Sequence, residues 1–312
     1  MAEWKGTYTA LVTPFRDGHI DEAALERLIE RQVRAGVDGV VPVGTTGESS
    51  TLDYEEHVRV IELTVKVAAG RTKVMAGSGA NSTKEAIYLT QRAEAAGADA
   101  TLQVAPYYNR PTQEGLFQHF REVARATRLP VILYNIPSRC GVEIAVDTVR
   151  RLAEACPNVV GIKEAGGNPD RVSQLRAALG PRFWILSGDD ALTLPFMAVG
   201  ANGVVSVASN VIPREMVRMV NAFAEGDPGT ARRIHARYYP LFKDLFLETN
   251  PIPVKAALAM MGLIAEEYRL PLVPMAPANR ERLAQTLQAC GLIRSGAAPA
   301  PQTRRRSATR TV

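Results

Sequence analysis

Cysteine and histidine are scarce in this 312-residue chain, which contains three cysteines and four histidines. Cys140, Cys156 and Cys290 lie far apart, and the chain has no Cys-x-x-Cys pair and no Cys/His spacing of a metal site. We therefore expect no metal ion in this protein. So few thiols also suit the reducing cytoplasm, where disulfides are rare.

Long apolar runs without interruption are also missing. The N-terminal segment has no basic region followed by an apolar one, so we expect no secretory signal. Residues 191–213 carry no charge and are long enough to suggest a membrane span, but Pro195, Gly200 and Asn202 interrupt them. We expect a buried helix followed by a buried strand in this stretch, and no membrane contact.

Neither sign of charge dominates the chain. Its 37 Lys and Arg residues against 32 Asp and Glu residues give a formal charge of +5. Four of the arginines lie in segment 297–312, which has no acidic residue, so the rest of the chain carries only +1. A nucleic-acid-binding protein needs basic residues spread over a folded face. We therefore expect no nucleic-acid partner.

What the chain does contain is an alternation of short apolar runs with longer amphipathic segments. The runs are almost continuously hydrophobic, which is typical of parallel strands covered on both faces. The predicted strands are Thr7–Pro14, Gly39–Gly44, Lys73–Gly79, Ala100–Pro106, Pro130–Asn135, Val159–Ala165, Phe183–Asp189 and Gly203–Ser209. Helical periodicity predicts helices between and after them at Asp21–Ala35, Asp53–Ala69, Thr83–Ala96, Thr112–Thr127, Ala145–Ala155, Asp170–Leu179, Asp190–Val199 and Pro213–Ala224.

Eight strand–helix units in this length predict an α/β fold, a (β/α)8 TIM barrel with a C-terminal helical appendage. We expect a catalytic barrel over residues 1–225, a helical region over 226–296 and a disordered basic tail over 297–312. The helical region contains the predicted helices Asp227–Glu248, Val254–Met261 and Ala278–Ala289. The competing fold, a doubly wound open sheet, usually has a Gly-rich dinucleotide loop after its first strand, and this chain has none there.

Reactive residues of such a barrel lie at the C-terminal ends of its strands, and Lys163 is the most informative residue there. Alternation along its apolar strand places Val159 and Lys163 on one face and Val160 on the other. If Lys163 points into the barrel, burial disfavours its charged form, and a neutral amine can attack a ketone to form a Schiff base. The alternative is a lysine paired with Glu164 or another carboxylate.

Schiff-base chemistry moves protons at each step, and no histidine lies near a predicted strand end. Three hydroxyls do, those of Thr45, Tyr108 and Tyr134, and together they would form a proton relay. The alternative for each tyrosine is a half-buried aromatic residue whose hydroxyl is already hydrogen-bonded.

Two further features suit a carboxylate. The sequence GTTGES, residues 44–49, offers loop amides and hydroxyls before a helix, although it is also compatible with a simple tight turn. Arg139 has a planar guanidinium that fits a carboxylate, although a surface salt bridge would also explain it.

The pair Asp189 and Asp190 favours a helix N-cap over a metal site, because aspartate is a preferred capping residue.

Several spaced motifs, in their order along the chain, give this sequence a resemblance to the pyruvate-dependent aldolases. This family includes dihydrodipicolinate synthase and N-acetylneuraminate lyase. The similarity covers roughly residues 6–292. It rests on GTTGES (44–49), PYYNRP (106–111), YNIPSRCG (134–141), GIKEA (161–165), SGDDA (187–191) and NPIPVK (250–255).

The resemblance implies that Lys163 forms a Schiff base with pyruvate and that no metal or organic cofactor takes part. It implies that Tyr134 is the general acid/base and that Thr45 and Tyr108 complete the relay, with Tyr108 donated across a dimer interface. The substrate-binding residues that it implies are Thr46 for the pyruvate carboxylate, Arg139 for the carboxylate of L-aspartate 4-semialdehyde, and Gly188 and Val205 as pocket lining.

Arg139 discriminates within this family, because the sugar-acid lyases usually lack an arginine in that motif. The resemblance therefore implies the condensation of pyruvate with L-aspartate 4-semialdehyde to 4-hydroxy-tetrahydrodipicolinate, in lysine and diaminopimelate biosynthesis, by a cytoplasmic homotetramer. A class I aldolase acting on another 2-oxo acid is the alternative. A third hypothesis is a non-catalytic protein whose basic tail binds nucleic acid or an acidic surface.

Many bacterial members of the family are inhibited by L-lysine, and the resemblance implies a matching site in this chain. Tyr54 departs from the pattern, because lysine-sensitive members often carry histidine there. The positions that match are Ser49, Ser50, His57, Asn81, Glu85 and Tyr107.

Overall fold

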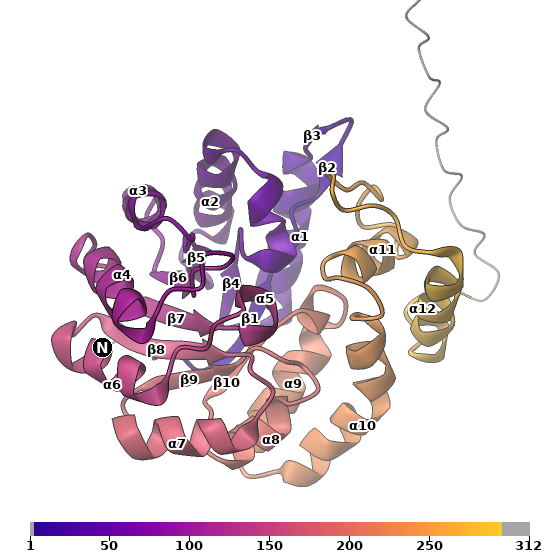
Figure 1. Cartoon of the computed structure of the whole chain (residues 1–312). Coiled ribbons are helices and arrows are strands. Elements are labelled where there is room, and N and C mark those ends of the chain that lie inside the picture. The colour runs from indigo at the N-terminus through magenta and orange to yellow at the C-terminus, as the bar shows by residue number, and fades with distance from the viewer. Residues whose placement is uncertain (1–2, 295–312) are drawn as a thin grey trace, which may run out of the picture.

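The computed structural model describes residues 3–294, which contain a closed barrel of eight parallel strands (Figure 1). Around the barrel the strands follow the order β1-β10-β9-β8-β7-β6-β5-β4. Their bounds are β1 (Gly6–Ala10), β4 (Gly39–Val41), β5 (Lys73–Gly77), β6 (Ala100–Val104), β7 (Val131–Asn135), β8 (Val159–Glu164), β9 (Trp184–Ser187) and β10 (Gly203–Ser206). The predicted (β/α)8 fold is therefore confirmed.

Helices cover the outside of the barrel, and side-chain caps start several of them. Asp21 accepts a hydrogen bond from Ala24 N over 2.9 Å, and Asp53 forms a capping box with Glu56. The helices that follow the strands are α1 (Glu22–Ala35), α2 (Tyr54–Ala68), α3 (Thr83–Ala95), α4 (Gln113–Arg125), α6 (Val146–Ala155), α7 (Pro169–Leu179), α8 (Thr193–Ala198) and α9 (Pro213–Ala224). The helix and strand expected within the charge-free stretch are thus present as α8 and β10.

The short elements of the fold were not predicted, because each has too few residues to show a periodic pattern of apolar residues. They are the hairpin strands β2 (Phe15–Arg16) and β3 (His19–Ile20), the helix α5 (Pro137–Cys140), and the 3-10 turns η1 (Thr45–Gly47), η2 (Ser49–Thr51) and η3 (Ala208–Asn210). Two of them, η1 and α5, follow barrel strands and carry predicted site residues.

The barrel interior and the layer between strands and helices form separate apolar clusters. Met75, Ile132 and Leu186 belong to the interior cluster, whereas Ile162 packs with the outer one. The predicted alternation was wrong at the start of β8, where Val159 packs outward and Val160 inward. The cause is a register shift between β7 and β8, which inserts one residue and reverses the facing of the residues before it.

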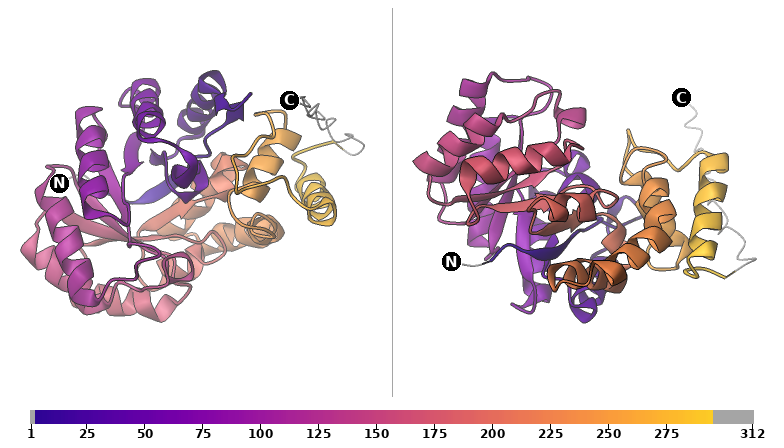
Figure 2. Two further views of the ribbon diagram at one scale, coloured as in Figure 1. Left: turned by 45° about the horizontal axis from the view of Figure 1, so that its top comes forward. Right: turned by 90° about the horizontal axis from the view of Figure 1, so that it is seen from below.

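Three further helices, α10 (Pro228–Asp244), α11 (Ile252–Met260) and α12 (Pro277–Ala289), complete the described chain. They share one apolar cluster with α9, and both views of Figure 2 show α11 and α12 at one side of the barrel. The predicted basic tail, 297–312, lies outside the described residues. Within residues 3–294 no helix combines the length and the apolar character that crossing a bilayer requires.

Candidate active site

Lys163 points into the barrel, as the sequence predicted. Its neighbours across the strands are Tyr134 on β7 and Leu186 on β9, both in the interior cluster. The lysine side chain is 7% exposed, and its Nζ lies 4.0 Å from the centroid of the Tyr134 ring. No carboxylate within residues 3–294 lies within ion-pair distance of this amine.

Pairing of Lys163 with Glu164 is excluded by the direction of the Glu164 side chain. Glu164 is fully buried on the outer side of β8, where its carboxylate accepts hydrogen bonds from Arg171 Nε at 2.7 Å and Asn135 Nδ2 at 3.0 Å. Consecutive residues of a strand face opposite ways, so the carboxylate that neighbours Lys163 in sequence is held away from it.

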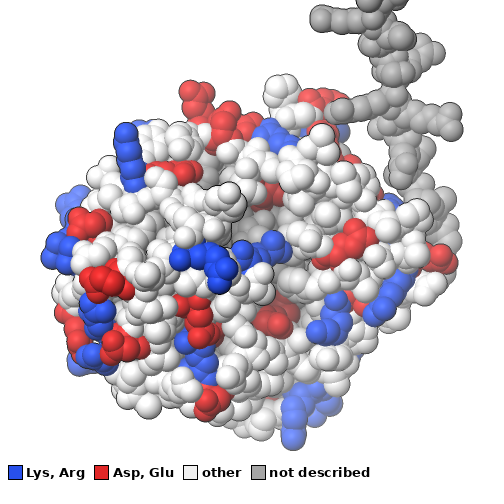
Figure 3. All heavy atoms as spheres, viewed as in Figure 1, with Lys and Arg blue, Asp and Glu red and all other residues white. Residues whose placement is uncertain are grey.

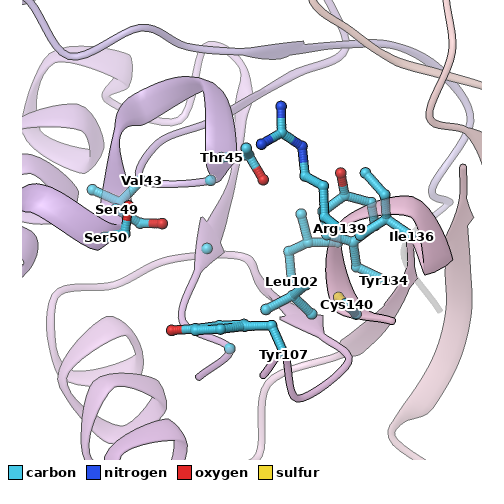
Figure 4. Close-up of a pocket in the computed structure, with 14 residues that line it drawn as sticks. Val43, Thr45, Ser49, Ser50, Leu102, Tyr107, Tyr134, Ile136, Arg139 and Cys140 are labelled. Atoms are coloured by element: carbon cyan, nitrogen blue, oxygen red, sulfur yellow. The ribbon is translucent and has the colours of Figure 1, made fainter. Parts of the chain in front are cut away.

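A cavity of ≈ 240 Å³ lies over the C-terminal ends of β4 to β7. Three residues predicted for the site, Thr45, Tyr134 and Arg139, line it together, and Figure 4 shows them on facing sides of the same space. Tyr134 therefore contacts both the cavity and the amine of Lys163. Figure 3 shows a hollow on this face, with basic side chains at its edge.

The segment GTTGES forms a tight turn after β4, and a turn of this kind is compatible with both interpretations of the motif. Gly47 N donates to Gly44 O over 3.0 Å, Glu48 N donates to Thr45 O over 3.1 Å, and Thr13 Oγ1 donates to Gly47 O over 2.7 Å. Val43, directly before this segment, and Glu48, within it, have φ angles of 49° and 55°. Left-handed backbone is strained for such residues and often marks functional sites.

Arg139 forms no salt bridge with any residue of the described range, 3–294, but contacts a residue from the C-terminal helical region. Its Nη2 donates to Asn250 O over 3.1 Å, and Asn250 Nδ2 donates to Thr46 Oγ1 over 3.0 Å. Asn250 thus joins the two residues expected to hold the substrate carboxylates. We gave it no role from the sequence, although it opens the NPIPVK motif that contributed to the family resemblance.

Gly188 and Val205 also lie beside the site. A Cβ at Gly188 would lie 3.2 Å from Lys163 Cε and 2.6 Å from the Cβ of Ala165, so only glycine fits there. Val205 is buried in the interior cluster with Tyr134. Gly188 thus packs closely against the side chain of Lys163, whereas Val205 shares the interior cluster with Tyr134.

Two predicted catalytic residues, Lys163 and Tyr108, do not line the cavity, and of these Tyr108 is exposed to solvent. Its side chain is 92% exposed and its φ is 74°, whereas the neighbouring Tyr107 lines the cavity. Burial, followed by the charge of Glu85, raises the pKa of Tyr107. An exposed aromatic side chain held in a strained backbone conformation suits contact with another protein surface.

The residues expected to bind L-lysine gather around Tyr107 and the cavity. Ser49 and Ser50 line the cavity, and Asn81 Nδ2 donates to Tyr107 O over 3.2 Å. His57 is buried, with its Nε2 2.8 Å from Gly77 O, and burial lowers its pKa. Glu85 lies in the first turn of α3 and influences Tyr107 electrostatically.

The predicted helix N-cap at Asp189 and Asp190 was wrong, because α8 begins after Leu192 and has no side-chain cap. Asp189 instead closes the turn before that helix, where its Oδ1 accepts hydrogen bonds from Ala191 N at 2.8 Å and Leu192 N at 3.2 Å. Asp190 is fully buried and links β9 to the segment after β10 through Val207 N and Ala208 N, at 3.1 and 2.8 Å. Its surroundings raise the pKa of this carboxyl to about 6, chiefly by burial. Among the residues that the structure describes, no group of three potential metal ligands occurs.

Comparison with known proteins gives consistent matches over nearly the whole chain. A family model described as the dihydrodipicolinate synthetase family matches residues 3–290. The 4-hydroxy-tetrahydrodipicolinate synthase of Thermodesulfovibrio yellowstonii is 54% identical over 291 residues, which are 93% of this chain and 100% of that protein.

Solved structures agree with this match. The 4-hydroxy-tetrahydrodipicolinate synthase of Methylacidiphilum fumariolicum SolV is 60% identical, with a TM-score of 0.92 over 93% of this chain and 96% of the other. The DHDPS of Cyanidioschyzon merolae, solved with lysine bound, is 44% identical, with a TM-score of 0.90 over 93% of this chain and 99% of the other.

Proposed function

The chain belongs to the dihydrodipicolinate synthetase family, and on that premise we propose that Lys163 forms the Schiff base through which it condenses pyruvate with L-aspartate 4-semialdehyde. This is the reaction of a 4-hydroxy-tetrahydrodipicolinate synthase, a lyase of lysine and diaminopimelate biosynthesis. The observation that carries the assignment of Lys163 is its buried amine, which lies 4.0 Å from the Tyr134 ring without a carboxylate partner among residues 3–294.

The first half of the reaction uses the amine and the turn η1. The neutral amine of Lys163 attacks the ketone carbon of pyruvate, and the carbinolamine loses water to give the Schiff base. Thr46 and the turn amides hold the pyruvate carboxylate. Tyr134, with Thr45 and the partner subunit's Tyr108, moves the protons that these two steps require.

The second half joins the two substrates. Loss of a proton from the pyruvate methyl group converts the Schiff base into an enamine, whose carbon attacks the aldehyde of L-aspartate 4-semialdehyde. Arg139 holds the carboxylate of that substrate, with its guanidinium fixed by Asn250 O. The substrate amine then attacks the former ketone carbon, which closes the ring and releases the amine of Lys163.

The alternative is a related class I aldolase that uses the same lysine on another 2-oxo acid. The position of Arg139 on the cavity favours L-aspartate 4-semialdehyde, because a guanidinium can form two parallel hydrogen bonds with the carboxylate of that substrate. The exposed Tyr108 supports a dimeric catalytic unit, and we propose a homotetramer built from two such dimers. The scarcity of cysteine supports a cytoplasmic location.

Inhibition by L-lysine is part of the proposal. Ser49, Ser50, Asn81 and Tyr107 gather at one side of the cavity and offer hydroxyl, amide and carbonyl groups to an amino acid. Glu85 supplies a negative charge close to Tyr107 for the ligand's ammonium group. Activity that stays unchanged at millimolar L-lysine would remove this part of the proposal without affecting the rest.

Borohydride trapping tests the central assignment directly. Reduction in the presence of pyruvate converts the Schiff base into a stable secondary amine, and peptide mass spectrometry locates it. We expect a single adduct on Lys163. An adduct on another lysine, or no adduct at saturating pyruvate, would contradict the proposal.

A further inference from the structure

A second buried lysine, Lys255 on α11, lies outside the catalytic set. Its side chain is fully buried, and its Nζ forms an ion pair with Glu48, which is 2% exposed. The same ammonium lies 4.3 Å from the ring centroid of Phe15 and 5.3 Å from that of Tyr268. The pair is therefore sealed between the helical region and the first loops of the barrel, where removal of one partner would leave an uncompensated charge.

Glu48 connects this pair to the turn that holds Thr45 and Thr46. Its backbone donates to Thr45 O over 3.1 Å, and its own carbonyl accepts the Thr51 hydroxyl at 3.1 Å. The φ of Glu48 is 55°, a conformation in which glycine is usual and glutamate is strained. A charged residue in such a position must be held there by its side chain, and the contacts with Lys255 and with Arg269 N at 3.4 Å supply that restraint.

We infer that Lys255 is a positioning residue for pyruvate binding: through Glu48 it fixes the turn η1, and so the place at which Thr46 and the turn amides meet the pyruvate carboxylate. This inference rests on the proposed function. The relationship is long-range, because Glu48 and Lys255 are 207 positions apart and come from the barrel and the helical region. The helical region thus acts on the substrate site, in addition to covering the outside of the barrel.

A purely structural role of the Glu48–Lys255 pair and a positioning role predict different effects of its replacement on pyruvate binding. If the pair only stabilises the fold, its replacement lowers thermal stability and leaves the kinetic constants of the folded enzyme unchanged. If it positions the turn, its replacement weakens pyruvate binding in particular. The pyruvate concentration at half-saturation must then rise, while saturating pyruvate must still label Lys163 fully, because Lys163 and Tyr134 stay in place.

The test uses the double variant Glu48→Gln/Lys255→Met, since either single variant would leave a buried charge without its counter-charge and could unfold the protein. The matched control is Asp244→Asn/Arg282→Met, which removes a 2.7 Å ion pair of the same region that contacts neither Lys255 nor the turn. Each protein is trapped with borohydride over a range of pyruvate concentrations, and adduct formation on Lys163 is measured by mass spectrometry alongside steady-state kinetics.

For the Glu48/Lys255 variant we expect the half-saturating pyruvate concentration to rise about 10-fold, with full adduct formation on Lys163 at saturation. The control variant should match wild type in both measurements. Half-saturation equal to that of wild type in a folded Glu48/Lys255 variant would overturn the inference. A wild-type protein that forms no adduct would instead remove the proposed function, and the inference with it.

Discussion

The Nζ of Lys163 lies over the ring of Tyr134, 4.0 Å from the ring centroid. The two residues are direct neighbours on the adjacent strands β8 and β7. This arrangement places an aromatic ring beside the amine, on a residue that also lines the substrate cavity. The proposed nucleophile and the proposed acid/base residue are therefore neighbours before any substrate binds.

Replacement of Lys163 by arginine should abolish catalysis. A guanidinium keeps the positive charge but cannot become a neutral nucleophile, so we expect a loss of roughly 10³-fold or more in kcat/KM and no borohydride adduct. Lys84→Arg, at an exposed position on α3, is the control and should behave as wild type. A Lys163→Arg enzyme that retains substantial activity would exclude a Schiff base on this residue.

Tyr134→Phe removes one hydroxyl and preserves the ring against Lys163. We expect kcat to fall by about 10²- to 10⁴-fold, because proton transfer during Schiff-base formation loses its acid/base group. Trapping at long times should still label Lys163, since the amine stays in place. Tyr239→Phe, which changes an exposed tyrosine of α10, serves as the control. Equal trapping rates for Tyr134→Phe and wild type would argue against the assigned role.

Arg139→Ala should separate the two substrates. Loss of a charge-assisted contact predicts a fall of about 10- to 100-fold in kcat/KM for L-aspartate 4-semialdehyde. Pyruvate adduct formation should be nearly unchanged, since Lys163 and the turn η1 remain. Arg150→Ala, on the outer helix α6, is the matched control. If Arg139→Ala leaves the semialdehyde kinetics intact, the alternative aldolase on another 2-oxo acid gains support.

Gly188→Ala tests how closely Lys163 is packed. The added methyl group would lie 2.6 Å from Ala165 Cβ and 3.2 Å from Lys163 Cε, so the strand ends must move apart or the lysine must shift. We expect a stability loss of about 1–3 kcal/mol in denaturant unfolding together with slower trapping on Lys163. Gly229→Ala, where the nearest atom lies 3.3 Å away, should leave both measurements near wild type.

Asp190 should make stability depend on pH. Burial raises the pKa of this carboxyl from 3.8 to about 6, so the folded state binds its proton more tightly than the unfolded state does. Its contribution to stability is therefore fully present below the unfolded pKa and is lost as the pH rises through about 6. The loss amounts to roughly 2–3 kcal/mol by pH 7.

The check for Asp190 is a comparison with Asp190→Asn, which stays neutral and can still accept the amides of Val207 and Ala208. Denaturant unfolding between about pH 4 and pH 7.5 should show wild type losing stability relative to the variant as the pH rises. The difference between the two curves isolates this one group, because all other titrations are common to both. Parallel curves would show that Asp190 does not titrate in this range.

The sequence by itself determined the fold class and the candidate for the Schiff-base lysine. Continuous apolar runs alternating with capped amphipathic helices allow few arrangements other than a (β/α)8 barrel, because each strand must be covered on both faces. A lysine near the end of such a strand is directed inward or outward by alternation alone. Lys163, Tyr134, Thr45 and Arg139 were therefore identifiable before any coordinates, with the family resemblance giving their roles.

The tertiary structure decided what local patterns do not encode. The extra residue in β8, at the register shift with β7, reversed the directions in which Val159 and Val160 point. Such a bulge depends on the pairing of two strands and cannot be read from either strand alone. The contact of Asn250 with Thr46 and the ion pair of Lys255 with Glu48 join segments more than two hundred positions apart. Such contacts exist only once the barrel closes and the helical region packs on it, because proximity in the fold, and not spacing in the chain, brings those side chains together.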